Sequence, residues 1–306
     1  MAFTAADVKT LREMTGVGMM DCKKALAEAD GNMDKAVEIL REKGLAASQK
    51  KAGRIAAEGM AYAAVIDGVG VVVEVNAETD FVAKNDKFVD FVKGVAATVA
   101  ANKPADLDAL MECKYAGTDL TVTQQQQEMV LVIGENIKVR RFAFYTEGVS
   151  VPYIHAGGKI GVLVNLDTDL TAEQVNEAGK DAAMQIAALN PRFWDKSQVT
   201  EDVLAEEKKI MLAQMANDPK MANKPDQVKE KIVDGKLNKF YSENCLLQQE
   251  FVKDGDYTVE KYLAKCAKEL GGTITFKTAV RFEKGEGIEK KQENFAEEIA
   301  KQLAGN

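Results

Sequence analysis

Apolar residues recur at helical spacing in the first 44 residues, in three short runs that glycines separate. Thr4 and Asn32 suit the N-caps of the first and third runs, because their side-chain oxygens can accept a backbone N–H. Gly44 is expected to close the third run, and a basic, small-residue connector follows it at residues 45–57. The pattern predicts a small three-helix domain that, with its linker, occupies residues 1–54.

The pattern then changes to β-type runs that occur twice along the chain. The first copy has predicted strands at 58–66 and 70–76, joined by Asp67-Gly68, and the second has strands at 149–155 and 160–166, joined by Gly157-Gly158. Each hairpin precedes helical sequence and a closing β run, at 137–145 and at 273–282. We therefore predict an α+β fold with two three-stranded antiparallel sheets, each covered by helices on one face, in core subdomains 55–146 and 147–282.

The second copy is longer than the first. Asn76 and Phe142 are 66 positions apart, whereas Asn165 and Phe282 are 117 apart, so the second copy has 51 additional residues. A charged helical run, a break at Asn217-Asp218-Pro219 and a second helical run predict a helical hairpin at about 190–235.

Residues 283–306 form a predicted C-terminal module. Its apolar residues Phe295, Ile299 and Leu303 lie on one face of a helix, which must pack on this chain or on a partner.

The composition excludes several classes of protein. No apolar run approaches the roughly 18 residues that a membrane-spanning helix needs. The four cysteines are far apart and form no CxxC pair, which argues against a zinc site or a disulfide framework. The N-terminus shows no secretory signal, so we expect a cytoplasmic protein. The net charge of −8 does not favour general binding to nucleic acid.

The candidate chemistry favours a binding protein over an enzyme. The chain has one histidine, His155, and neither a GxxxxGK[ST] motif nor a GxGxxG motif after a strand. We therefore expect no catalytic residue, no metal and no cofactor. Two other classes stay open at this point: an enzyme built around His155, and an RNA-associated protein that uses Lys50, Lys51 and Arg54.

The stretch Thr79-Asp80-Phe81-Val82-Ala83-Lys84-Asn85 lies between a predicted strand and a predicted helix that starts near Asp86. One interpretation buries Phe81 in the core and uses Asp80 or Asn85 as a helix N-cap. The other exposes Phe81 as a contact for a partner.

This stretch resembles the signature of the bacterial elongation factor Ts family. Residues 15–26, Thr-Gly-Val-Gly-Met-Met-Asp-Cys-Lys-Lys-Ala-Leu, are similar to the N-terminal signature of that family, in which a ubiquitin-associated-type domain opens the chain. Ile-Gly-Glu-Asn-Ile at 133–137 and Tyr-Ile-His at 153–155 also resemble family motifs, although Ala156 and Lys159 depart from the usual pattern. The resemblance covers essentially the whole chain.

The resemblance implies a nucleotide-exchange factor that makes and breaks no bonds itself. It implies binding to elongation factor Tu, in the GDP-bound and nucleotide-free states, and faster release of GDP. Phe81 and Asp80 would insert into the GTPase domain and disturb Mg²⁺ binding, with Val82 and Ala83 supporting them.

The resemblance implies further contacts with the GTPase at Met19, Met20 and Lys23, at Ile133 and Gly134, and at His155. Met19 and Met20 are consecutive at a helix start, so they cannot both face one small core. The sequence leaves the oligomeric state open.

Overall fold

The computed structural model describes residues 3–218, 220–221 and 224–289. Three helices open it: α1 (Ala5–Thr15), α2 (Met19–Glu28) and α3 (Met33–Lys51). Thr4 caps α1 in a capping box with Asp7, and Gly16 ends this helix with a left-handed backbone, as the sequence predicts. Leu11, Cys22 and Leu26 form the buried centre of the three helices.

The prediction that Gly44 closes the third helix is wrong. Helix α3 continues for seven residues to Lys51, so most of the expected connector is helical. Gly44 is buried where α3 crosses α7 (Val122–Ile133). A Cβ atom at Gly44 would lie 3.2 Å from the carbonyl oxygen of Gln127. The glycine therefore permits a close approach of two helices and does not end one.

Two antiparallel three-stranded sheets follow, and they confirm the predicted fold class. The strands are, in the first sheet, β1 (Glu58–Ile66), β2 (Val69–Ala77) and β3 (Lys138–Tyr145), and in the second, β4 (Val149–His155), β5 (Ile160–Thr168) and β8 (Ile274–Glu283). The helices around them are α4 (Asp80–Ala83), α5 (Asp86–Asn102), α6 (Leu107–Glu112), α7, α8 (Ala172–Leu189) and α11 (Val259–Leu270). A short hairpin that the sequence did not predict, β6 (Glu250–Phe251) and β7 (Asp254–Thr258), precedes α11.

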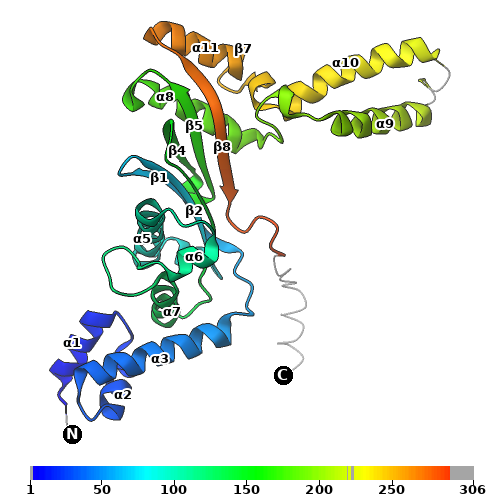
Figure 1. Cartoon of the computed structure of the whole chain (residues 1–306). Coiled ribbons are helices and arrows are strands. Elements are labelled where there is room, and N and C mark those ends of the chain that lie inside the picture. The colour runs from blue at the N-terminus through cyan, green and yellow to red at the C-terminus, as the bar shows by residue number, and fades with distance from the viewer. Residues whose placement is uncertain (1–2, 219, 222–223, 290–306) are drawn as a thin grey trace.

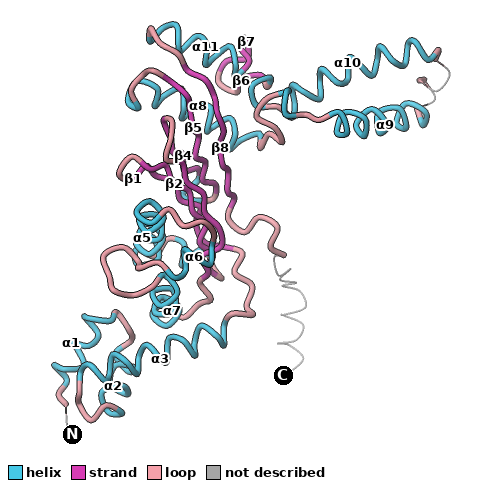
Figure 2. The backbone as a smooth tube through the Cα atoms, in the orientation of Figure 1, coloured by secondary structure: helices cyan, strands magenta, loops and turns pink. Residues whose placement is uncertain are grey.

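Helices cover one face of each sheet, and the two remaining faces pack on each other (Figure 2). Alternate residues of β2 explain this: Val71, Val73 and Val75 join the core beneath α5, whereas Val72 packs against the second sheet. Two glycines allow the close contact. A Cβ atom at Gly70 would clash with Ser150 on β4, and one at Gly161 would press on Ala61 of β1.

These contacts also correct the alignment of the two copies. Gly70 and Gly161 make reciprocal contacts, and β-bulges follow Glu74 and Asn165, so these pairs are structurally equivalent. Glu74 pairs with Arg141, and Asn165 pairs with Thr278. Glu74 and its partner are 67 positions apart in the chain, and Asn165 and its partner are 113 apart. The second copy therefore has 46 additional residues and not 51. The structural equivalent of Arg141 is therefore Thr278 and not Arg281, which lies three positions later.

The additional residues include the predicted helical hairpin. Helices α9 (Glu201–Asn217) and α10 (Asp226–Asn244) run side by side and project away from the sheets (Figure 1). Met215, Val233 and Leu237 are buried between them. Helix α10 extends to Asn244, beyond the predicted end of the insertion near residue 235. The predicted helix with Phe295, Ile299 and Leu303 lies outside the described residues.

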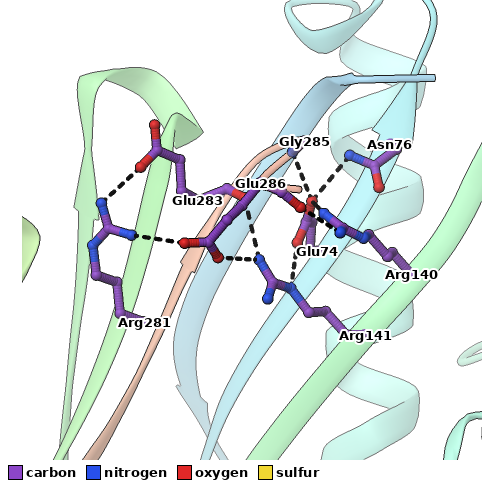
Figure 3. A network of polar contacts seen from close by, with 8 residues as sticks. All are labelled: Glu74, Asn76, Arg140, Arg141, Arg281, Glu283, Gly285 and Glu286. Carbon is purple, nitrogen blue, oxygen red and sulfur yellow. Dashed lines mark hydrogen bonds and ion pairs between the residues drawn. The ribbon is translucent and has the colours of Figure 1, made fainter. Parts of the chain in front are cut away.

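A fully buried carboxylate, Glu74, lies on the inner face of β2 (Figure 3). One of its oxygens accepts hydrogen bonds from Gly285 N–H at 2.8 Å, Arg140 Nη1 at 2.9 Å and Asn76 Nδ2 at 3.1 Å. The other accepts from Arg141 Nε at 2.5 Å. Glu74 thus joins β2, β3 and the segment after β8.

The neighbours of Glu74 extend this network across the two sheets (Figure 3). Arg141 also bonds to the Glu286 carboxylate at 3.0 Å, and its guanidinium lies 4.3 Å from the ring centre of Phe282. Burial opposes ionisation of Glu74, but the Gly285 N–H, the two arginines and Asn76 outweigh it and hold the pKa of Glu74 below its ordinary value.

Glu74→Gln is expected to lower the free energy of unfolding by about 3 kcal/mol at pH 7, because it leaves two arginines without their buried counter-charge. Since the folded-state pKa is lowered, this contribution is present above the unfolded-state value of 4.5 and disappears as the pH falls through the folded-state value. Urea titrations at pH 7 and pH 3.5 would measure both effects. Glu147→Gln is the control, because exposed Glu147 pairs with Lys277 at 3.8 Å.

Candidate functional site

The turn between β2 and α5 presents Phe81 to solvent. Its side chain is 81% exposed, which excludes the interpretation that Phe81 is a core residue. Thr79 is the N-cap of α4, and Asn85 is the N-cap of α5. Asp80 is exposed beside Phe81, and its carboxylate lies 3.5 Å from Lys84 Nζ. An exposed phenyl ring next to a carboxylate therefore projects from a capped, one-turn helix.

Val82 and Ala83 are buried behind Phe81, unlike Asp80. Val82 belongs to the core beneath the first sheet. Their side chains can therefore hold α4 against the core, and Val82 also lines the open groove beside Phe81.

Glu135, in the segment between α7 and β3, fixes the turn. Its carboxylate accepts hydrogen bonds from the backbone N–H groups of Glu78 and Thr79, at 3.1 and 3.0 Å, and from Thr79 Oγ1 at 2.7 Å. In return, the Glu78 carboxylate accepts from Asn136 N–H at 2.6 Å. Sequence reasoning missed this role of Glu135, because Glu135 and Thr79 are 56 positions apart in the chain.

Ile133 and Gly134 lie directly before Glu135. Gly134 ends α7 with a left-handed backbone (φ 87°), which explains the glycine. Ile133 is partly buried against the core and also lines an open groove of about 430 Å³ beside Phe81. Lys87 and Glu135 lie on the same groove. The structure thus brings two of the predicted contact segments, 80–83 and 133–134, to one surface.

The methionine pair lies on a separate, neighbouring element. Met19 and Met20 begin α2 and are 44% and 64% exposed, and Lys23 is exposed one turn later. Lys87 Nζ donates a hydrogen bond of 3.2 Å to Gly16 O, in the loop before α2. Because Lys87 also lines the groove beside Phe81, it links the loop before Met19 and Met20 to the Phe81 turn.

His155 ends β4 and is exposed, with Nδ1 3.0 Å from the hydroxyl of Tyr153. A chain of contacts places it at the same end of the sheets as Phe81. Lys284 bonds through Nζ to Glu58, which pairs with Ala77 at the end of β2, and through its N–H to Lys159 O, just after His155. In the residues that the structure describes, no hydrogen bond or ion pair joins His155 to the Phe81 turn.

The described residues contain neither a group of metal-ligating side chains nor a membrane-spanning helix. Within residues 3–218, 220–221 and 224–289, no three histidine, cysteine, aspartate or glutamate side chains are grouped so that they could hold a metal ion. In the same part of the chain, no helix has the length and apolar character to cross a membrane.

Comparison with known proteins decides the family. A sequence model of the family described as Elongation factor TS matches residues 78–286. The chain belongs to the elongation factor Ts family. It is 48% identical to elongation factor Ts of Syntrophotalea carbinolica over 98% of this chain and 99% of that protein. It is 50% identical to elongation factor Ts of Trichlorobacter lovleyi, over 98% of each chain.

The region that matches the elongation factor Ts family begins and ends in polar networks described above. Glu78 binds Asn136 beside the Phe81 turn, and Glu286 binds Arg141 beside Glu74. A third relative, elongation factor Ts of Clostridium kluyveri, is 48% identical over 99% of both chains, so the likeness also includes the N-terminal helices.

Glu135→Gln is expected to loosen the Phe81 turn, because an amide cannot accept three hydrogen bonds as a carboxylate does. Amide hydrogen exchange should become about tenfold faster across residues 78–85, with little change in β2. Hydrogen–deuterium exchange with mass spectrometry would measure this. Glu112→Gln, at an exposed position of α6, should leave the exchange unchanged. Equal protection in wild type and Glu135→Gln would refute the supporting role of Glu135.

Proposed function

We propose that this chain is a nucleotide-exchange factor that binds elongation factor Tu carrying GDP and accelerates the release of GDP. Membership of the elongation factor Ts family over nearly the whole chain supports the exchange role. The observation that carries the proposed mechanism is the exposure of Phe81 on a hydrogen-bonded turn.

An exposed phenyl ring on a firm support is suited to insertion into another protein. Burying a phenylalanine side chain gains about 1.5–3 kcal/mol relative to leaving it in water. Because Thr79 and Glu135 already fix the turn, little conformational entropy is lost when Phe81 binds. These terms make Phe81 an anchor for the partner.

In the proposed mechanism, Phe81 and Asp80 insert into the GTPase domain and disturb the elements that hold Mg²⁺. Losing the metal removes a positive charge from the diphosphate oxygens, so GDP leaves faster. A thousandfold faster release requires a barrier lower by about 4 kcal/mol. If this chain lowers the affinity of elongation factor Tu for GDP, linkage requires that GDP lower the affinity of elongation factor Tu for this chain to the same extent. Buried Val82 and Ala83 support Phe81 from behind.

Further contacts in the proposal are those that the family resemblance implies. Met19, Met20 and Lys23 form one contact surface on α2, Ile133 and Gly134 form a second beside Phe81, and His155 forms a third. These segments share one end of the sheets or are linked to it through Lys87. The chain needs no cofactor for this role, since binding energy alone drives release.

Phe81→Ala is expected to weaken binding to nucleotide-free elongation factor Tu by about 2–4 kcal/mol, as loss of a buried aromatic anchor does. Stopped-flow release of a fluorescent GDP analogue from elongation factor Tu should show a large acceleration by wild type and a blunted one by Phe81→Ala. Leu189→Ala, which shortens another exposed apolar side chain at the end of α8, is the matched control.

The outcomes separate the function from the mechanism. Equal acceleration by wild type and Phe81→Ala would keep the exchange function and refute the insertion of Phe81, and His155→Ala would then be the next variant. No acceleration by wild type would refute the exchange function itself.

A further inference from the structure

Helix α3 belongs to two hydrophobic cores at once. Ala36 and Leu40 are buried among the N-terminal helices, whereas Ala47, two turns later, packs against the core of the first sheet. In the other direction, Leu131 and Val132 of α7 pack against the core of the N-terminal helices. The N-terminal helices are therefore continuous with the first subdomain through the crossing of α3 and α7 (Figure 1).

Gly44 sits at this crossing. A Cβ atom there would lie 3.2 Å from the carbonyl oxygen of Gln127 and 3.5 Å from its carbon, so alanine requires a shift of a few tenths of an ångström between α3 and α7, and a larger side chain requires more. Arg41 Nε lies 3.5 Å from the Glu128 carboxylate beside the crossing. Glycine inside a helix costs about 1 kcal/mol relative to alanine, and the close approach of the two helices explains why it is present here.

A second contact restricts the orientation of the N-terminal helices about this crossing. Lys87, on the first turn of α5, donates to Gly16 O in the loop that leads to Met19 and Met20. Two separate attachments, one at α3 and one at this loop, define how the methionine pair lies relative to Phe81. Neither attachment involves Phe81 or the methionines directly.

We propose that Gly44 is a positioning residue, which lets α3 seat on α7 so that Met19 and Met20 are held at a fixed spacing from Phe81. The inference rests on the proposed function, because that spacing matters only if both surfaces bind the same GTPase. Two contacts on one rigid body bind with a high effective concentration, whereas a loosely attached second contact pays an ordering cost at each encounter.

The first test measures GDP release from elongation factor Tu as a function of factor concentration for Gly44→Ala, Gly44→Leu and wild type. Gly44→Leu should raise the half-maximal concentration about tenfold with little change in the maximal rate, since Phe81 is untouched. Gly44→Ala requires a shift of only a few tenths of an ångström and should retain most of the activity. Gly235→Leu is the matched control, because a Cβ atom at Gly235 of α10 meets nothing within 4 Å.

A double-mutant cycle tests whether Gly44 acts through the methionines. If it does, adding Gly44→Leu to Met19→Ala/Met20→Ala should cause little further loss, because the contact that Gly44 positions is already gone. Fully additive losses would overturn the proposal.

A distance measurement tests the spacing without a partner. Spin labels at Lys24→Cys and Lys138→Cys, both exposed, would report the distance from α2 to β3 in a Cys113→Ser/Cys266→Ser background, where Cys22 and Cys245 are buried. Wild type and Gly235→Leu should give one narrow distribution, and Gly44→Leu a broader or displaced one. A narrow, unchanged distribution in Gly44→Leu would overturn the role of Gly44, whereas failure of wild type to accelerate release would overturn the exchange function.

Discussion

The pairing of Glu74 with Arg140 and Arg141 is the interaction on which the arrangement of the two sheets depends. An isolated carboxylate without solvent would cost several kcal/mol, so Glu74 is tolerable only with all its partners in place. Those partners come from β2, from β3 and from the segment after β8. One buried charge therefore requires three parts of the chain, up to 211 positions apart, to assemble correctly.

The same strand that carries Glu74 leads directly to Phe81. Strand β2 ends at Ala77, and only Glu78 and Thr79 separate it from α4. Because β2 is the central strand of its sheet and buried along its length, its end is a firm base for an exposed side chain. The exposed position of Phe81 is thus stabilised by the core beneath β2 and by the hydrogen bonds of Glu135.

Much of the fold could be predicted from the sequence, because it depends on local patterns. The strands at 58–66 and 149–155 agree with the structure to the residue, since alternation and turn glycines mark their ends. Gly44 was misread because a glycine that ends a helix and one that admits another helix look alike without the partner helix. The predicted alignment of the two copies is wrong for a similar reason, because the true alignment follows β-bulges that form only against the neighbouring strand.

The candidate site was predictable in part. The exposed ring of Phe81 could be anticipated only through the family signature, because burial is the ordinary expectation for an aromatic residue. The supports of that ring were hidden from sequence reasoning. Glu135 is 56 positions from Thr79, and no local pattern connects them. Lys87 and Gly16 are 71 positions apart, so their contact also depends on the folded chain.

The equivalence of Glu74 and Asn165 has a consequence for how the two halves of the chain recognise each other. Both side chains are buried at the seam between the sheets, but one is an anion that needs arginines and the other is a neutral amide that bonds to Glu147 O and Ser150 Oγ. Two copies of the first half, packed together by the same geometry, would place a pair of like charges at the seam without the Gly285 donor. The two halves are therefore not interchangeable, because the buried anion of the first half is matched by a donor that follows the second.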